Sequence, residues 1–377
     1  MEKKVKKDPS QMRHGYTTGA CSTAVTKAAL TALITGDALE EATISLPIGR
    51  DATFTIEKYD ISENAVSAET IKDAGDDPDA THLAHIISTV SWSDVPGIIL
   101  DGGTGVGRVT KPGLPVPVGE AAINPVPRKM ILTTVQQTLE EFKINRGVKV
   151  VISVPAGEEI AKKTLNGRLG IVGGISILGT RGTVVPFSSS AYMASIVQAI
   201  SVAKASGCEH LVLTTGGRSE KYAMGLLQDL PEEAFIEMGD FVGFSLKQCK
   251  RQGIKKVSLV GMMGKFSKVA QGVMMVHSKS APVDFGFLSE IAQSVGAGND
   301  LVLEIKNANT ASQVGDMMSA INNFDFFNKL CESCCHSAIK QVKGGIEMET
   351  AIYSLKGQLL GRAVGIESID EINRDRG

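Results

Sequence analysis

A glycine-rich segment in the second half of the chain has the composition of a ligand-binding loop. Residues 214–220 read Thr-Thr-Gly-Gly-Arg-Ser-Glu and lie between a run of strand-forming residues and a stretch that predicts a helix. Glycines let a bound molecule approach the backbone closely, and the first amides of the following helix can bind a carboxylate or a phosphate. We interpret the segment as a ligand loop. A tight strand-to-helix turn without a ligand is the alternative.

Two further loops follow the next two predicted strands. Residues 237–240 read Glu-Met-Gly-Asp, and acids at such a position often hold ribose hydroxyls in open α/β sheets, although Asp240 would serve equally as a helix N-cap. Residues 261–267 read Gly-Met-Met-Gly-Lys-Phe-Ser. A phosphate loop needs four residues between its glycines and Ser or Thr directly after its Lys, so this segment does not predict a nucleoside triphosphate site. Lys265 and Lys268 could still contact carboxylates.

A long loop in the first half is rich in glycine and proline. Residues 101–108 read Asp-Gly-Gly-Thr-Gly-Val-Gly-Arg, but Arg108 occupies the place of the last glycine of a dinucleotide fingerprint, and residues 111–115 exclude an immediate helix. Long loops are often functional, so Arg108 and Lys111 could contact a large ligand. An irregular surface loop is the alternative.

Two clusters contain side chains that can bind metals. The aspartates within residues 73–79 have oxygen ligands that suit Mg²⁺ or Ca²⁺, but they lack the calcium-loop spacing, and a solvated turn or a site that orients ring amines or water fits as well. The run Cys331-x-x-Cys334-Cys335-His336 lacks a second pair at zinc spacing and lies in a helical pattern. We therefore expect no bound metal, and free thiols packed on a helix.

The elements that position these residues differ between the two halves. Short alternating segments over 42–92 predict an antiparallel meander, preceded by a helix over 21–33 that Thr17-Thr18-Gly19 can cap, and followed by a helix over 128–142. Segregated strands and helices indicate an α+β sandwich.

From about residue 207 the pattern changes to strand, loop, helix, which predicts a parallel, Rossmann-like sheet with ligands at the carboxyl ends of its strands. The chain should then be helical from 301 to about 343 and end in a hairpin over 351–363. We expect an α+β domain over 1–200 and, over 201–377, a Rossmann-like α/β domain with a helical C-terminal extension.

Bulk composition limits the classes of protein. The chain has 377 residues, 43% hydrophobic and 21% charged, and a net charge of −2, which is typical of a folded globular protein without a general attraction for nucleic acid. No apolar run of about 18 residues follows the lysines at the start or occurs elsewhere. Six cysteines in so long a chain do not make a secreted disulfide framework. We expect a cytoplasmic protein with reduced thiols and no membrane partner.

Taken in order, these segments resemble the CbiD family, the cobalt-precorrin-5B C1-methyltransferases of anaerobic cobalamin (vitamin B12) biosynthesis. Each string is short, but a set in the same order is difficult to obtain by chance. The cysteine cluster and the lysine-rich start are not part of the resemblance, which is carried by residues 13–19, 72–79, 105–114, 122–128, 179–188, 214–220, 239–243 and 261–265.

The resemblance implies an enzyme that transfers a methyl group from S-adenosylmethionine to a cobalt-corrinoid. The family resemblance is also compatible with assembly of the chain into a homo-oligomer. We expect the donor to be bound by Thr214, Thr215, Gly216, Gly217, Glu237, Gly239, Asp240, Gly261 and Gly264. We expect the corrinoid to be bound by Arg13, Thr17, Thr18, Asp73, Asp76, Asp77, Arg108, Lys111, Arg128 and Lys265. The resemblance identifies no catalytic residue. A nucleotide-dependent kinase or ligase, and a corrinoid carrier without a donor site, remain alternatives.

Overall fold

The chain forms two compact units. The structure, a computed structural model, describes residues 11–277 and 279–365. The units are Met1–Ser189 and Ser190–Gly377, and each has its own hydrophobic core. Both contain helices and sheets, so the expected mixture of α and β structure is confirmed.

The first unit is built on a five-stranded sheet. Three consecutive strands, β4 (Lys58–Ile61), β5 (Ala65–Ile71) and β6 (His85–Ser93), pair antiparallel. β6 then pairs antiparallel with β10 (Gly147–Ser153), which pairs parallel with β7 (Ile98–Gly102). Every second residue of β5 and β6 is buried, as expected for a sheet with one covered face. The predicted meander is therefore confirmed for β4 to β6.

The preceding two strands are separate from this sheet. β2 (Glu41–Ser45) and β3 (Asp51–Thr55) pair antiparallel with each other as a two-stranded sheet of their own. Smaller strands complete the unit: β1 (Gly15–Tyr16), β8 (Gly105–Val106), β9 (Arg108–Val109), β11 (Ile171–Val172), β12 (Gly174–Ile175) and β13 (Thr183–Val184). They pair as β1 with β13, β9 with β11 and β8 with β12.

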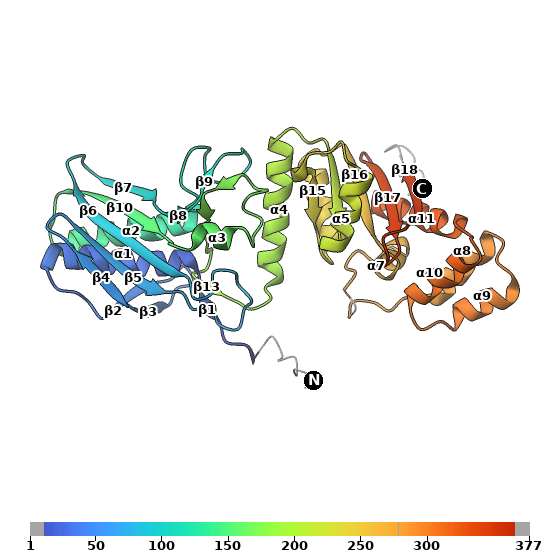
Figure 1. Cartoon of the computed structure of the whole chain (residues 1–377), viewed down its shortest axis with the longest axis horizontal. Helices are drawn as coiled ribbons and strands as arrows, with labels where there is room; N and C mark the ends of the chain where they lie inside the picture. Colours follow the sequence, from blue (N-terminus) through green and yellow to red (C-terminus); the bar gives the residue numbers. More distant parts are fainter. Residues whose placement is uncertain (1–10, 278, 366–377) are drawn as a thin grey trace. The chain divides into compact units, whose positions relative to one another are not determined.

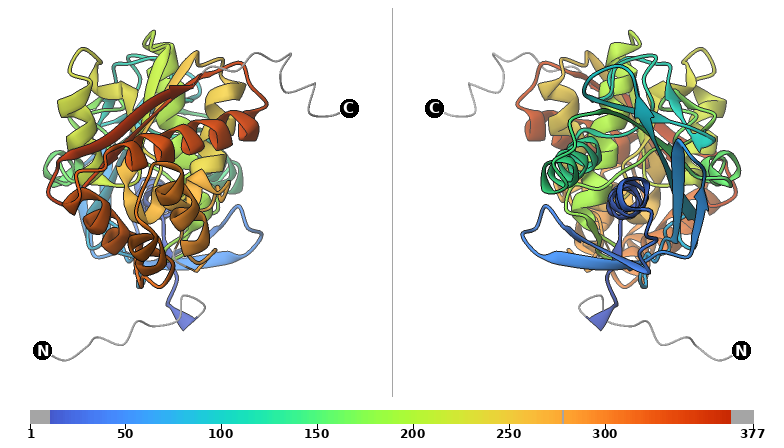
Figure 2. Two further views of the ribbon diagram at one scale, coloured as in Figure 1. Left: turned by 90° about the vertical axis from the view of Figure 1, so that its right-hand side faces the viewer. Right: turned by 90° about the vertical axis from the view of Figure 1, so that its left-hand side faces the viewer.

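Two helices, α1 (Thr18–Thr35) and α2 (Pro125–Glu141), cover one face of the main sheet of the first unit (Figure 1). α1 is seen end-on beside the strands in Figure 2, right. Its small residues let it pack closely, and most of them are buried. Both helices begin earlier than predicted, because the Thr17 hydroxyl accepts a bond from the Ala20 amide (3.2 Å) and a proline at the first helical position starts α2.

The glycine-rich loop of the first unit is a junction of closely packed backbones. A Cβ on Gly105 would lie 1.9 Å from the Val154 carbonyl oxygen. A Cβ on Gly157, in α3 (Gly157–Ala161), or on Gly174 would lie 2.0 and 2.1 Å from the Gly105 carbonyl oxygen. Contact between backbones therefore explains these glycines. The expectation that no helix follows the loop directly is confirmed, since α2 begins only at Pro125.

The second unit contains a five-stranded sheet in the order β15-β14-β16-β17-β18. Its strands are β14 (His210–Thr214), β15 (Phe235–Glu237), β16 (Lys256–Met262), β17 (Glu347–Tyr353) and β18 (Leu359–Gly365). The first four in the spatial order are parallel and β18 is antiparallel. The predicted parallel sheet and the predicted hairpin are both confirmed. The hairpin does not belong to a separate extension, because β17 pairs directly with β16.

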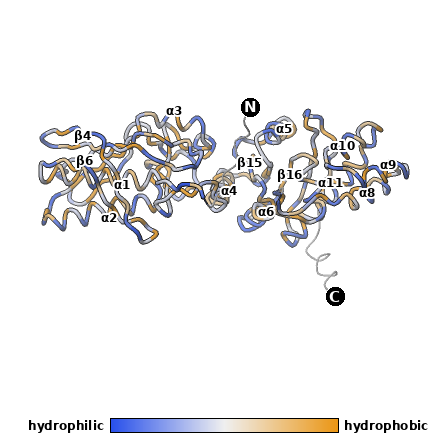
Figure 3. The backbone as a smooth tube through the Cα atoms, turned by 90° about the horizontal axis from the view of Figure 1, so that it is seen from below, coloured by the Kyte–Doolittle hydropathy of each residue, from blue (hydrophilic) through white to orange (hydrophobic). Residues whose placement is uncertain are grey.

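Helices surround this sheet, and hydrophobic segments such as β16 lie inside the unit (Figure 3). α11 (Asp325–Val342) packs against β17 and β18, as the left panel of Figure 2 shows. The predicted helical tail is confirmed, but turns divide it into three helices, α9 to α11. The helices are α4 (Ser189–Ala205), α5 (Gly217–Leu226), the 3₁₀ helix η2 (Glu232–Ala234), α6 (Val242–Arg251), α7 (Met263–Ala270), α8 (Phe285–Ser294), α9 (Asn299–Lys306), α10 (Ala311–Ala320) and α11 (Asp325–Val342).

The cysteine cluster is part of the core of the second unit. Cys331, Cys334 and Cys335 are buried free thiols on α11, as predicted. The Cys334 thiol donates to the Phe266 carbonyl oxygen (3.3 Å), and burial raises the pKa of all three thiols. Within residues 11–277 and 279–365, no group of three or more His, Cys, Asp or Glu side chains could hold a metal ion.

The glycine junction predicts a specific loss of stability. We expect Gly174→Ala to lower the free energy of unfolding of the first unit by about 3 kcal/mol, because the new methyl would overlap backbone atoms that cannot move independently. Urea denaturation followed by fluorescence of Trp92, the single tryptophan and a residue of β6, measures it. The control is Gly167→Ala, where a Cβ meets no described atom within 4 Å, and it should change the value by less than about 0.5 kcal/mol. Equal effects of the two substitutions would contradict the packing explanation.

Candidate functional site

The three predicted ligand loops of the second unit lie at one edge of the sheet. β14 ends at Thr214, β15 at Glu237 and β16 at Met262, and parallel strands place their carboxyl ends on the same side. β15 pairs with one edge of β14 and β16 with the other, so the chain changes direction across the sheet after β15. Ligands of open α/β sheets bind outside the carboxyl ends at such a switch point.

Lys265 connects the three loops. Its ammonium donates to the Thr215 carbonyl oxygen (3.2 Å) and lies 3.0 Å from Oδ1 of Asp240. The Met238 amide donates to the Thr214 carbonyl oxygen (2.8 Å), which joins the β14 and β15 loops directly. The structure therefore brings the expected donor residues together. Lys265 was expected among the corrinoid residues and lies instead with this group.

Three glycines of the loops border open space. A Cβ on Gly217 or Gly264 would meet no described heavy atom within 4 Å, and one on Gly216 would meet only Oε1 of Glu237, at 3.8 Å. Gly216 has φ +156°, a conformation that favours glycine. Gly261 and Gly239 differ, because a Cβ there would lie 2.1 Å from the Phe266 ring and 3.0 Å from the Tyr192 ring. Only the first three leave room for a ligand against the backbone.

Asp240 places its carboxylate at this edge of the sheet, where it is paired with Lys265. The alternative of a helix N-cap is wrong, because α6 has Phe241 at its N-cap position and no side-chain cap bond. Oδ1 of Asp240 is buried, and the Lys265 ammonium at 3.0 Å compensates its charge. The open glycines and this carboxylate therefore lie at the same edge of the sheet.

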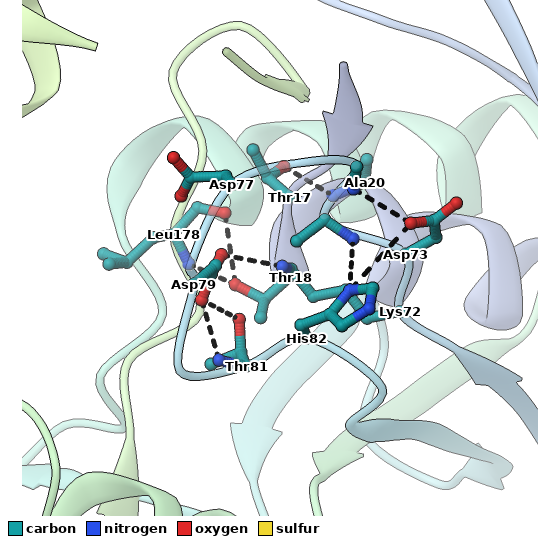
Figure 4. Close-up of polar contacts among 12 residues, drawn as sticks. Thr17, Thr18, Ala20, Lys72, Asp73, Asp77, Asp79, Thr81, His82 and Leu178 are labelled. Carbon is teal, nitrogen blue, oxygen red and sulfur yellow. Dashed lines mark hydrogen bonds and ion pairs between the residues drawn. The ribbon is translucent and has the colours of Figure 1, made fainter. Parts of the chain in front are cut away.

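The acidic segment of the first unit is a tightly bonded turn rather than a set of free carboxylates (Figure 4). The guanidinium of Arg13 forms an ion pair with Asp73 and its backbone amide donates to Asp76 Oδ2 (3.0 Å). The Gly75 amide also donates to Asp73 (2.9 Å). Hydrogen bonding from Arg13 is the main cause that lowers the pKa of Asp73 to about 2.

The neighbouring residues of the turn have internal partners as well. Asp77 accepts from the Phe187 amide (2.9 Å). Asp79 accepts from Lys72 (2.8 Å), whose side chain is only 1% exposed. Thr18 exchanges hydrogen bonds with both backbone groups of Leu178 (2.8 and 3.3 Å). The structure therefore brings Arg13, Thr17, Thr18, Asp73, Asp76 and Asp77 together as one region.

Of the other expected corrinoid residues, Arg128 lines a hollow at the start of α2, whereas Arg108 and Lys111 do not line it. Arg108 bonds to Asp101 (2.9 Å) and to the Gly119 carbonyl oxygen (3.4 Å), while Arg128 bonds to Glu120 (3.0 Å). Lys111 bonds to the Arg168 carbonyl oxygen (3.4 Å). The hollow has a volume of about 490 Å³ and is lined by Pro115, Val116, Pro117, Glu120, Ile123, Pro125, Arg128, Lys129, Leu132 and Thr133. Apolar walls beside two cations suit a large ligand with acidic side groups.

The sequence analysis did not identify two features of these regions, the lining of the hollow and the place of Tyr192. The proline walls and Lys129 could have been found from the spacing of prolines around Arg128. Tyr192 belongs to α4 and had no local pattern that indicated a site. Its hydroxyl donates to the Glu237 carbonyl oxygen (3.3 Å), so that only the fold places it beside the donor loops.

Similarity to known proteins extends along most of the chain. Residues 5–186 match the CbiD family and residues 275–364 match the CbiD C-terminal domain. A Priestia megaterium protein named cobalt-precorrin-5B C(1)-methyltransferase is 69% identical over 362 residues, which cover 96% of this chain and 99% of the relative. The chain belongs to the CbiD family. The resemblance inferred from the sequence is thereby confirmed.

Other members of the family are also similar. A Geobacillus kaustophilus protein of the same name is 66% identical over 96% of this chain and 98% of its own length. A crystal structure titled cobalamin biosynthesis protein (cbiD) from Archaeoglobus fulgidus is 30% identical and covers 67% of this chain and 78% of its own, with a TM-score of 0.38. No helix within the described ranges is long and apolar enough to cross a membrane.

The Arg13–Asp73 ion pair predicts a pH dependence. We expect Arg13→Ala to return the pKa of Asp73 from about 2 towards the ordinary value of roughly 3.9, as measured by NMR titration of the carboxyl carbon. Because the folded-state pKa is lowered, the pair stabilises the folded state above pH 4 and this contribution disappears as the pH falls through about 2. The control is Arg108→Ala, which should raise the pKa of Asp101, its own partner, and leave that of Asp73 unchanged.

Proposed function

We propose that the chain is a cobalt-precorrin-5B C1-methyltransferase, an enzyme that transfers a methyl group from S-adenosylmethionine to C1 of cobalt-precorrin-5B and produces cobalt-precorrin-6A in anaerobic cobalamin biosynthesis. The observation that carries the proposal is the 69% identity, over nearly the full length of both chains, to a relative with this name. Neither a kinase nor a ligase has a comparable observation in its favour, since the segment around Lys265 lacks phosphate-loop spacing.

The second unit, in this proposal, is a Rossmann-like layer that binds the methyl donor. Its support is the switch point between β14 and β16, the open space at Gly216, Gly217 and Gly264, and the buried carboxylate of Asp240 beside Lys265. Asp240 and Glu237 would accept hydrogen bonds from ribose hydroxyls, while the first amides of α5 lie beside the open glycines. Lys265 would hold Asp240 in place or contact the donor carboxylate.

The first unit binds the corrinoid in this proposal. Cobalt-precorrin-5B carries several carboxylate side chains on a broad ring, and the hollow at α2 combines apolar proline walls with Arg128 and Lys129. A charge-assisted hydrogen bond to each carboxylate contributes roughly 1.5–3 kcal/mol. The cobalt arrives inside the substrate, so the chain itself needs no metal ligands.

The mechanism depends on positioning. When bound, S-adenosylmethionine would supply an electrophilic methyl group, and a ring carbon of the corrinoid would provide the new bonding pair. The glycine loops would hold the donor, and Arg128 and Lys129 at the hollow would orient the ring. Correct orientation of two reactants can lower a barrier by roughly 7–11 kcal/mol, so a side-chain nucleophile is unnecessary.

The donor site has a direct test in Gly217→Val. The substitution should abolish saturable binding of S-adenosylmethionine in calorimetry, because the added side chain fills the space that the donor would occupy, while the thermal stability stays the same. Gly225→Val is the control, since it lies on the same helix, α5, and also faces open space. Loss of binding in both variants, or in neither, would contradict this position of the site.

The corrinoid site has a corresponding test in Arg128→Ala. We expect the affinity for cobalt-precorrin-5B, followed by its visible absorbance, to fall roughly 10- to 150-fold, with the affinity for S-adenosylmethionine unchanged. Arg146→Ala is the control, because this arginine lies over the Trp92 ring (4.8 Å) away from the hollow. The reverse pattern would refute the assignment of the two units. Tight corrinoid binding without any donor binding in the unaltered protein would favour a carrier instead of an enzyme.

A further inference from the structure

The hollow at the start of α2 contains a carboxylate of the chain itself, that of Glu120. This residue lines the hollow together with Arg128 and Lys129. Oε2 of Glu120 accepts a hydrogen bond from Nη2 of Arg128 (3.0 Å), and this contact pairs the two charges. A ligand carboxylate that enters the hollow therefore meets a guanidinium that already has an anionic partner.

The backbones on both sides of this pair are fixed. A turn ends at Glu120, whose amide donates to the Pro117 carbonyl oxygen (3.2 Å), and Gly119 has the positive φ (+92°) that the third position of a type II turn requires. The Glu120 carbonyl oxygen accepts from the Val109 amide (3.0 Å). Arg128 lies near the start of α2, a helix of 17 residues. The two side chains can therefore separate while the backbones that carry them stay in place.

The pair is partly exposed and uses little of the guanidinium. The side chains of Arg128 and Glu120 are 31% and 49% exposed. Within residues 11–277 and 279–365, the bond to Glu120 is the only side-chain hydrogen bond of Arg128. Arg13, by contrast, bonds to Asp73 through both of its terminal nitrogens. An exposed ion pair with one hydrogen bond is weak, so Arg128 can exchange one carboxylate for another.

Lys129 gives the hollow a second cation. It is exposed, and it forms no ion pair with any residue that the structure describes. Two cations against the one carboxylate of Glu120 leave a surplus of positive charge in the hollow. A ring with several carboxylates can bind Lys129 with one of them while another replaces Glu120, and the two contacts reinforce each other. A ligand with a single carboxylate cannot do both.

We propose that Glu120 is an internal competitor for Arg128, a specificity residue whose carboxylate a carboxylate of the corrinoid displaces when the ring enters the hollow. This inference rests on the proposed function. The competition lowers the affinity for every carboxylate ligand in proportion to the time that Glu120 holds the guanidinium. A ligand with one carboxylate is then bound poorly, whereas a polycarboxylate ring is held at Lys129 as well.

Glu120→Gln tests the competition in the full chain, because it removes the charge and keeps the size of the side chain. The probe is cobyrinic acid, a cobalt corrin whose side chains are free carboxylates, and its visible absorbance reports binding. Its affinity should rise roughly 2- to 5-fold, the range expected when an exposed ion pair no longer occupies the site. Cobinamide, a cobalt corrin whose side chains are neutral amides, should bind with nearly unchanged affinity.

Two further variants separate direct contact from the general effect of a negative charge. Glu120→Asp keeps the carboxylate but withdraws it from Arg128 by the length of a methylene group, so the affinity for cobyrinic acid should rise here too. The matched control is Glu141→Gln, which removes the same charge from an exposed residue at the other end of α2 and should change neither affinity. Thermal unfolding of each variant separates a folding defect from a binding defect.

The outcomes separate this inference from the function on which it rests. A fall or no change in the affinity of Glu120→Gln for cobyrinic acid, an equal rise for cobinamide, or no rise in Glu120→Asp would overturn the competition while the corrinoid site stands. If the unaltered protein binds neither cobyrinic acid nor cobalt-precorrin-5B, the proposed corrinoid site itself is wrong and the role of Glu120 fails with it. A rise for cobyrinic acid alone, in both Glu120 variants and not in Glu141→Gln, supports the inference.

Discussion

Parallel pairing of β14 with β15 on one side and with β16 on the other is the constraint on which the site of the second unit depends. Backbone hydrogen bonds between parallel strands bring the ends of all three to one edge, although 50 residues separate Thr215 from Lys265 in the sequence. The contacts of Lys265 with Thr215 and Asp240 follow from this arrangement. Burial of the apolar side chains of these strands stabilises the arrangement, because they form the core beneath the loops.

The constraint in the first unit is the pairing of its charged side chains. Three charged pairs form within its polar segments: Arg13 with Asp73, Lys72 with Asp79, and Arg108 with Asp101. A nearly buried ammonium such as that of Lys72 requires a partner, because an unpaired charge away from water is very costly. The turn is therefore rigid before any ligand binds. The hollow at α2 combines apolar walls with Lys129 and with Arg128, which is itself paired with Glu120.

Glycine has two opposite roles in this protein, and they are not distinguishable by residue type. Gly105, Gly157 and Gly174 lie where backbones touch, and Gly217 and Gly264 lie where a Cβ would meet no described atom within 4 Å. The loop over 101–108 and the loop over 214–217 both matched the pattern of a ligand loop in the sequence. Only the neighbours in space, from distant segments, decide which glycine makes room for a ligand and which permits packing.

The sequence by itself determined the family, the alternation of strands and helices in the second half, the free thiols of α11 and the loops that meet at the sheet edge, because these depend on local pattern and on residue order. The tertiary structure decided the separate β2–β3 sheet, the place of Lys265 among the loops at the sheet edge, and the contact of Tyr192 with Glu237. These features arise from contacts between segments far apart in the chain. Local propensity carries no information about such contacts, since they are selected by the packing of whole elements against one another.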